Sequence, residues 1–207
     1  GQVMPSFDEF MRERHRPVAA GESVYVGRAP GAEGVAAPPR PRVAAGPMRV
    51  VAWTDGSSRG NPGPGGYGAV LLYRDPAGVM HRREFSQGYR RTTNNRMELL
   101  GVIVALEALR RPCEVEVHSD SQYVCNAFNK NWVTGWLRRG WRNAQKQPVK
   151  NVDLWKRLLA AKEPHQVSFV WLKGHAGTEL NERCDQLATS AADGASGPLL
   201  DDRGFTD

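Results

Sequence analysis

The chain has 207 residues, 40% of them hydrophobic, and its 28 Lys and Arg against 22 Asp and Glu give a formal net charge of +6. This length suits one domain with an appendage, and the basic charge favours a polyanionic partner. No apolar run approaches the ~18 residues of a membrane span, and no signal-peptide pattern opens the chain. The three cysteines form no CxxC pair. The membrane, secreted-scaffold and fibrous classes are therefore excluded, and a reducing, cytoplasmic compartment is expected.

Residues 1–47 differ in composition from the rest of the chain. They hold 7 of the 14 prolines and 6 of the 22 glycines but no Trp, which predicts a flexible N-terminal arm. Within the arm, Ser6 to Glu9 fits a capping box, and Phe7, Phe10 and Met11 fall on one helical face. Two interpretations stay open: a short fraying helix, which we favour, and a docking peptide for a protein partner.

The next region, residues 48–193, carries 21 basic and 14 acidic residues and shows clear strand and helix patterns. Runs of β-branched and apolar residues predict strands, and apolar residues at helical spacing predict helices. In chain order we expect strands at 48–54, 67–73 and 79–89, a helix at 95–109, a strand at 114–119, helices at 121–129 and 152–161, a strand at 166–172 and a helix at 179–192. A Gly- and Pro-rich loop is expected at 56–66, and residues 194–207 are expected to form a flexible C-terminal tail.

The order of these elements predicts the fold class. Three strands come first, and the last two strands each follow a helical crossover, which favours parallel pairing. We therefore expect an α/β fold with a five-stranded mixed sheet and helices on both faces.

Four carboxylates stand out by their positions. Asp55 ends the first strand and Asp120 ends the fourth, so they would emerge side by side if those strands were adjacent and parallel. Each acid also has an inert explanation: a turn at Asp55-Gly56, a helix-dipole contact by Glu98, a helix cap near Ser119 or Asp120, and a solvated Asp185. Spacing alone leaves open whether the four converge. If they do, they would bind divalent cations such as Mg²⁺, in the two-ion arrangement suited to phosphodiester cleavage.

Two further features carry functional hypotheses. His175 stands in a Gly-flanked loop, where it is either a surface residue or a proton carrier. Residues 130–150 contain six Lys and Arg, three Trp and no acid. These Trp could anchor an amphipathic helix and the basic residues could track nucleic-acid phosphates; we expect both.

Five segments in order resemble bacterial type I ribonuclease H: 54–70 (TDGSSRGNPGPGGYGAV), 92–100 (TTNNRMELL), 119–124 (SDSQYV), 148–155 (PVKNVDLW) and 173–188 (KGHAGTELNERCDQLA). The resemblance implies the ribonuclease H fold, with the catalytic domain at 48–193. It implies that Asp55, Glu98, Asp120 and Asp185 converge on two Mg²⁺ ions, with Mn²⁺ able to substitute, and that His175 transfers protons. It also implies endonucleolytic hydrolysis of the RNA strand of RNA–DNA hybrids, leaving 3′-hydroxyl and 5′-phosphate ends. We expect a monomer without membrane association.

The resemblance further suggests which residues contact the substrate. Minor-groove and backbone contacts are implied for Asn61, Asn94, Asn95 and Gln122, and a DNA-phosphate contact for Thr93 with either Arg91 or Arg96. Ser58 stands where some relatives have Cys. Residues 130–150 match the basic protrusion of the family, which holds the DNA strand. The resemblance therefore implies substrate contacts for Trp132, Trp136, Arg138, Arg139 and Arg142.

Two other functions fit the sequence less well. A binding-only module without catalysis is disfavoured because all four acids and His175 are present. A nuclease for other substrates is disfavoured by the TTNN segment and the basic protrusion.

Overall fold

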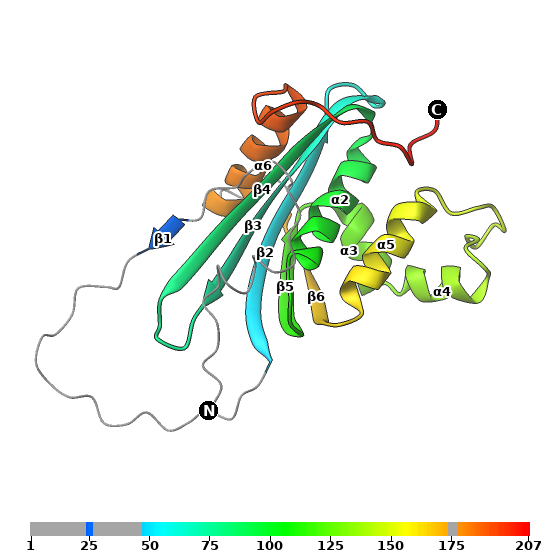
Figure 1. Cartoon of the computed structure of the whole chain (residues 1–207). Coiled ribbons are helices and arrows are strands. Elements are labelled where there is room, and N and C mark those ends of the chain that lie inside the picture. Colours follow the sequence, from blue (N-terminus) through cyan, green and yellow to red (C-terminus); the bar gives the residue numbers. More distant parts are fainter. Residues whose placement is uncertain (1–23, 27–46, 174–177) are drawn as a thin grey trace, which may run out of the picture.

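The computed structural model describes residues 24–26, 47–173 and 178–207, and for Val24–Val26 only the backbone pairing (Figure 1). One mixed sheet has the strand order β1-β4-β3-β2-β5-β6. Its strands are β1 (Val24–Val26), β2 (Met48–Ser58), β3 (Gly63–Arg74), β4 (Met80–Thr92), β5 (Cys113–Ser119) and β6 (Gln166–Trp171). Strands β2, β3 and β4 form an antiparallel meander, while β5 runs parallel to both β2 and β6.

The expected five-stranded mixed sheet is therefore confirmed. One strand was not expected: β1 lies within the predicted arm and pairs antiparallel with the edge strand β4.

The Gly- and Pro-rich stretch at 56–66 is mostly strand rather than loop. Its two sides pair with each other, with Ser57 opposite Gly66 and Ser58 opposite Gly65. Only residues 59–62 connect β2 to β3. Glycine in a strand often marks close approach of another backbone, and the helices on both faces make that approach here.

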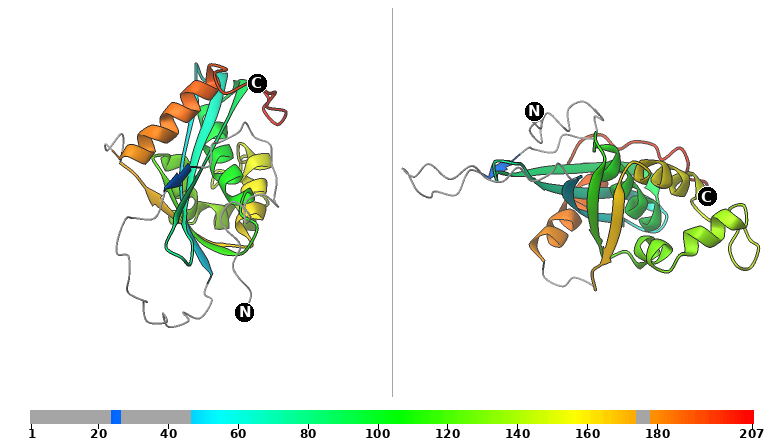
Figure 2. Two further views of the ribbon diagram at one scale, coloured as in Figure 1. Left: turned by 60° about the vertical axis from the view of Figure 1, so that its left-hand side comes forward. Right: turned by 90° about the horizontal axis from the view of Figure 1, so that it is seen from below.

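Five helices complete the described fold: α2 (Asn94–Glu107), α3 (Gln122–Asn129), α4 (Trp132–Arg138), α5 (Val152–Lys162) and α6 (Glu179–Ala192). Helix α2 packs on β2 and β3, and α5 packs on α2. Helix α6 contacts β3, β2 and β4 from the other face, so the sheet lies between two helical layers (Figure 2).

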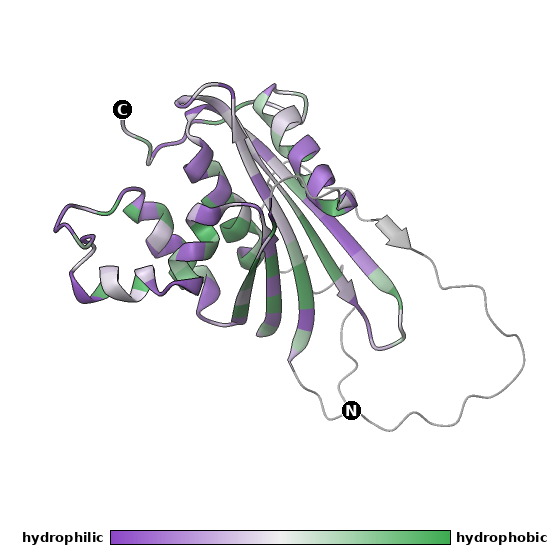
Figure 3. Cartoon of the chain, turned by 180° about the vertical axis from the view of Figure 1, so that it is seen from behind, coloured by the Kyte–Doolittle hydropathy of each residue, from purple (hydrophilic) through white to green (hydrophobic). Residues whose placement is uncertain are grey.

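The core lies mainly between the sheet and α2. Nearly the whole of α2 is buried from Arg96 to Leu106, because α5 covers the side that faces away from the sheet. Figure 3 shows hydrophobic residues concentrated in the strands and in these helices, and hydrophilic residues along the loop that follows α4. The α4 region projects from this body (Figure 1).

Residues 194–207 do not behave as the expected free tail in this structure. Leu200 bridges to Tyr89 of β4, and backbone hydrogen bonds join Arg90 to Leu200 at 2.8 Å and Leu200 to Gly88 at 3.0 Å. Farther along, the Asp202 carboxylate accepts hydrogen bonds from Thr92 Oγ1 and from the Arg96 guanidinium, each at 2.7 Å. The segment is held because β4 offers it an open edge and α2 offers it a buried cation.

Within the described part of the chain, no helix has the length and apolar character needed to cross a bilayer. The three cysteines, Cys113, Cys125 and Cys184, are buried free thiols.

Candidate active site

Two acids lie together where β5 ends beside β2. The expectation that Asp55 ends its strand is wrong, because β2 continues to Ser58, whereas Asp120 directly follows β5. Trp53 of β2 pairs in register with His118 of β5, so Asp55 and Asp120, two residues farther along, are at the same level. Asp55 does not form the turn that its Asp-Gly dipeptide allowed, since it is paired inside β2 with Gly68 of β3. The strand order alone therefore places these two carboxylates side by side.

Helix α2 brings a third acid to the same place. Gly56 makes this possible, because a Cβ at that position would collide with the backbone nitrogen of Glu98. Ligand oxygens of Asp55, Glu98 and Asp120 all lie within 4.8 Å of one another.

The inert roles suggested for two of these acids are not the ones they have. The cap of α3 is Ser121, whose Oγ accepts a hydrogen bond from the Val124 backbone at 3.2 Å, so neither Ser119 nor Asp120 caps this helix. Glu98 lies in the second turn of α2, and the first turn contains no acid. Helix capping therefore does not explain why an acid stands at position 120, and the helix dipole does not explain the acid at position 98. A shared acidic site accounts for both Asp120 and Glu98.

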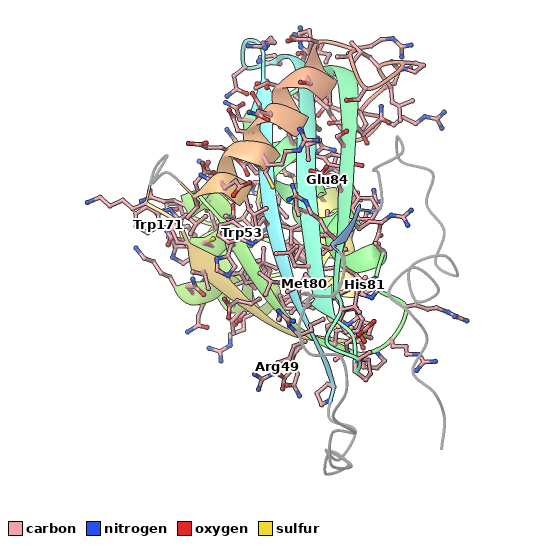
Figure 4. All side chains as sticks on the ribbon, turned by 90° about the vertical axis from the view of Figure 1, so that its left-hand side faces the viewer. Arg49, Trp53, Met80, His81, Glu84 and Trp171 are labelled. Carbon is pink, nitrogen blue, oxygen red and sulfur yellow. The ribbon has the colours of Figure 1, made fainter. Side chains whose placement is uncertain are left out.

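Asp185, on α6, lines the same open cavity of about 370 Å³ as the other three acids, although it is not within their 4.8 Å group. Helix α6 reaches the sheet closely because a Cβ at Gly68 would collide with the carbonyl oxygen of Cys184. An ion pair also holds it, since Arg183 donates to both carboxylate oxygens of Glu84 at 2.6 and 3.1 Å. Glu84 lies on β4 and is labelled in Figure 4. The structure therefore brings all four acids to one cavity. His175 lies outside the described residues.

Mutual repulsion and burial shift the protonation of this cluster. Burial, followed by the negative charge of Asp120, raises the pKa of Asp55 to about 7. Burial and the charge of Asp55 raise the pKa of Glu98 well above its usual value. Three carboxylates this close cannot all ionise at neutral pH without a compensating positive charge.

The residues fit a divalent cation. Every ligand atom in the group is a carboxylate oxygen, which is the donor that Mg²⁺ and Mn²⁺ prefer. The Oε2 atom of Glu98 is buried and has no hydrogen-bond partner among the described residues. Burying such an oxygen is costly unless a ligand satisfies it. A cation would satisfy this oxygen and remove the repulsion together.

The residues expected to contact substrate line the approach to this cluster. The Ser58 backbone donates to Asn94 Oδ1 at 2.7 Å, and the Asn94 backbone donates to Asn61 Oδ1 at 3.2 Å, so the β2–β3 turn is tied to the start of α2. Gln122 is exposed at the rim of the acidic cavity. Asn95 lines both this cavity and a second one, which shows that the two adjoin.

The second cavity, of about 700 Å³, contains Asn61 and Thr93. Thr93 caps α2, with its Oγ1 accepting a hydrogen bond from the Arg96 backbone at 3.3 Å. The two candidate arginines near it differ sharply. The Arg96 side chain is only 2% exposed, whereas Arg91 is 55% exposed and paired with Asp207.

Arg96 is fully engaged within the protein. It donates to Asp153 at 2.9 and 2.8 Å and to Asp202 at 2.7 and 3.0 Å. Burial alone would lower the pKa of Arg96, but the hydrogen bonds and charges of the two acids outweigh burial and raise it. Arg96 is therefore a structural cation, and of these two arginines only Arg91 is open to a ligand.

The basic segment 130–150 combines an anchored side with an exposed side. Trp136 stacks edge-on against the buried Trp155 of α5, with ring centroids 5.1 Å apart, whereas Trp132 is 43% exposed. Arg138, Arg139 and Arg142 are also exposed. Within the part of the chain that the structure describes, no ion pair involves a basic residue of this segment. The structure thus assigns anchoring to Trp136 and leaves the arginines available to an anion.

Several site residues were missed by the sequence reasoning. Ser57 and Tyr123 line the acidic cavity, and Asn151, Asp153 and residues 204–207 line the second one. Tyr123 stands inside the SDSQYV motif, which could have drawn attention to it. Residues 204–207 have no local pattern that signals their position.

Comparison with known proteins agrees with this geometry. The sequence model of the RNase H family matches residues 47–193. A protein named Ribonuclease H from Lachnoclostridium phytofermentans is 62% identical over 156 residues, covering 75% of this chain and 98% of the relative. A Ribonuclease H from Salmonella arizonae is 55% identical over 157 residues, covering 76% and 96%.

Solved structures show the same similarity. LC9-RNase H1, described as a type 1 RNase H with the type 2 active-site motif, has a TM-score of 0.66 and 32% identity, covering 77% of this chain and 81% of that one. LC11-RNase H1, solved in complex with an RNA/DNA hybrid, has a TM-score of 0.51 and 28% identity, covering 70% and 98%.

Proposed function

The chain belongs to the ribonuclease H family, and from that premise we propose that it is an endonuclease that hydrolyses the RNA strand of RNA–DNA hybrids by two-metal-ion catalysis. The observation that carries the proposal is the acidic group of Asp55, Glu98 and Asp120, with Asp185 in the same cavity. The products would carry 3′-hydroxyl and 5′-phosphate ends.

Asp55, Glu98, Asp120 and Asp185 are the residues that would hold the metal. Two Mg²⁺ ions, or Mn²⁺ in their place, would activate the attacking water and neutralise charge on the phosphate oxygens. The protein fixes the positions of these ligands through rigid elements, since two of them are set by β2 and β5 and two by α2 and α6. His175 is proposed as the group that carries a proton to or from the reaction.

Substrate selection is proposed to depend on the residues around the two adjoining cavities. Asn61, Asn94, Asn95 and Gln122, supported by Ser58, would contact the shallow minor groove, where 2′-hydroxyl groups distinguish RNA from DNA. Thr93 and the exposed Arg91 would hold a DNA phosphate, because Arg96 is buried in ion pairs.

The exposed Arg138, Arg139 and Arg142, with Trp132, would follow the backbone of the DNA strand beyond the site. Trp136 would contribute by fixing the orientation of this segment, since it packs on Trp155.

We propose that residues 48–193 carry the activity, that the protein acts as a monomer in the cytoplasm, and that residues 1–47 serve a separate purpose such as docking to a protein partner. Three buried free thiols agree with a reducing compartment.

The mechanism is tested with Asp120→Asn, which keeps the shape of the side chain and removes one metal-ligating charge. A labelled RNA–DNA hybrid is incubated with Mg²⁺, and the initial cleavage rate is measured. We expect the rate to fall by two orders of magnitude or more. The matched control is Glu116→Gln, an exposed acid four residues earlier on β5, which should retain full activity. Undiminished cleavage by Asp120→Asn would reject the mechanism, and equal cleavage of double-stranded DNA by the unmodified protein would reject the substrate.

A further inference from the structure

An acidic side chain that lines the second cavity, Asp207, is paired with the exposed Arg91. Asp207 accepts three hydrogen bonds from Arg91: Nε donates to both carboxylate oxygens at 3.1 Å, and Nη2 donates to Oδ1 at 2.6 Å. This is the two-pronged geometry in which a guanidinium also holds a phosphate. The carboxylate and a phosphate therefore need the same face of the same guanidinium.

The position of Asp207 within the cavity supports this competition. Asp207 lines the cavity together with polar Thr93 and Asn61 and the cation Lys150, while the other acid of the lining, Asp153, is already paired with Arg96. The pair is open to solvent, with 55% of the Arg91 side chain and 65% of the Asp207 side chain exposed. An exposed pair of this kind is weak and exchanges readily with other ions.

A nearby anchor delivers Asp207 to this position. Asp202 is only 6% exposed and is held by Arg96 and Thr92. From there the chain turns, with the Phe205 backbone donating to the Asp202 carbonyl at 3.1 Å, and it continues along the cavity to Asp207. Because the anchor lies five residues away, Asp207 stays within about 17 Å of Asp202 even when the ion pair opens.

We propose that Asp207 is an internal competitor for the phosphate-binding Arg91, and that it sets the affinity of the protein for the nucleic-acid backbone. The proposal rests on the proposed function, because it concerns a contact of the same substrate. A backbone phosphate that binds at Arg91 displaces the Asp207 carboxylate. The residue thus lowers affinity for any polyanion at this point and limits retention of the cleaved duplex.

The experiment compares Asp207→Asn with the unmodified 207-residue protein. Binding of a fluorescently labelled RNA–DNA hybrid is measured by anisotropy in EDTA, so that no cleavage occurs. Since an exposed ion pair opposes binding only modestly, we expect the dissociation constant to fall about two- to fivefold at low salt. The plot of log K against log salt should steepen by up to about 0.9, the slope of one neutralised phosphate, because in the unmodified protein the displaced Asp207 charge stays close to the phosphate and offsets its neutralisation.

Asp201→Asn is the matched control. Asp201 is also exposed, at 73%, and is paired with an arginine, but its partner is Arg90 and neither lines the cavity. It should change the dissociation constant by less than Asp207→Asn. In an Arg91→Ala background, Asp207→Asn should have no effect.

Three results would overturn the proposal: unchanged or weaker binding by Asp207→Asn, an equal gain from Asp201→Asn, or a gain that persists without Arg91. Cleavage of the hybrid by the unmodified protein in Mg²⁺ reports separately on the proposed function. If the unmodified protein does not cleave the hybrid, the proposed function is rejected. The ratio of the dissociation constants of the two proteins still tests the role of Asp207. Absence of hybrid binding by both proteins would reject both.

Discussion

The contact between Asp202 and Arg96 leads to a quantitative prediction for Asp202→Asn. The substitution preserves the size of the side chain and removes its charge. In the structure the Asp202 carboxylate, 6% exposed, faces a guanidinium that is 2% exposed. Arg96 would retain Asp153, which accepts two of its hydrogen bonds at 2.9 and 2.8 Å.

The size of the effect follows from this partial retention. Removing one partner of a buried ion pair costs about 3–5 kcal/mol, and a hydrogen bond to a charged group contributes about 1.5–3 kcal/mol. Because Asp153 still compensates Arg96, we expect the free energy of unfolding to fall by about 2–3 kcal/mol. For a chain of this size that corresponds to a fall in Tm of about 4–12 °C.

Thermal unfolding followed by circular dichroism measures this fall. Asp201→Asn provides the control, since its exposed pair with Arg90 should contribute less than about 1 kcal/mol. If the two variants were destabilised equally, or if Asp202→Asn unfolded at the temperature of the unmodified protein, residues 194–207 would be the free tail that composition suggests, and the structural reasoning would fail.

Two further predictions concern the acidic site and the basic segment. The pKa of Asp55 is raised to about 7 in the folded protein from 3.8, so the folded state binds more protons than the unfolded state between these values. Acids whose pKa is lowered, such as Glu84 and Asp153, add stability with rising pH only up to about pH 5. In EDTA the free energy of unfolding should therefore fall as pH rises from about 5 to 7, and Mg²⁺ should remove this dependence. A Tm that is flat over this pH range in EDTA would contradict the raised pKa. Replacing Arg138, Arg139 and Arg142 together by Ala should weaken hybrid binding, as measured by anisotropy titrations. The slope of log K against log salt should become shallower by about 0.9 for each phosphate that the protein no longer neutralises. An unchanged slope would show that these residues are not in the interface.

The sequence predicted those features of the site that depend on strand order. Adjacent parallel strands had to place Asp55 and Asp120 together, and the structure has that pairing. Glu98 was different, because its approach depends on an absent side chain at Gly56, which a propensity argument reads as a loop signal. The cap of α3 was predicted one or two residues too early, because Ser119, Asp120 and Ser121 are all residue types that cap helices well. In the structure it is Ser121 whose side chain accepts the hydrogen bond from the Val124 backbone.

The role of the last residues could not be predicted. The pair between Arg96 and Asp202 joins positions 106 residues apart. Arg96 stands in the TTNNRMELL motif, but no local pattern marks Asp202 as its partner. An acidic, Gly-containing ending is typical of a solvated tail, so composition favoured that interpretation. The same contact decides which of the two candidate arginines can bind a phosphate, because Arg96 is buried in ion pairs within the protein whereas Arg91 is exposed.

The glycines at positions 56 and 68 have a consequence for how the enzyme tolerates sequence change. At both places a helix rests directly on the backbone of a strand, with α2 over Gly56 and α6 over Gly68. The spacing of Glu98 and Asp185 from the sheet is thereby set by main-chain contact rather than by the size of nearby side chains. Substitutions of hydrophobic residues elsewhere in the core are therefore expected to lower stability more than they change the distances between the carboxylates.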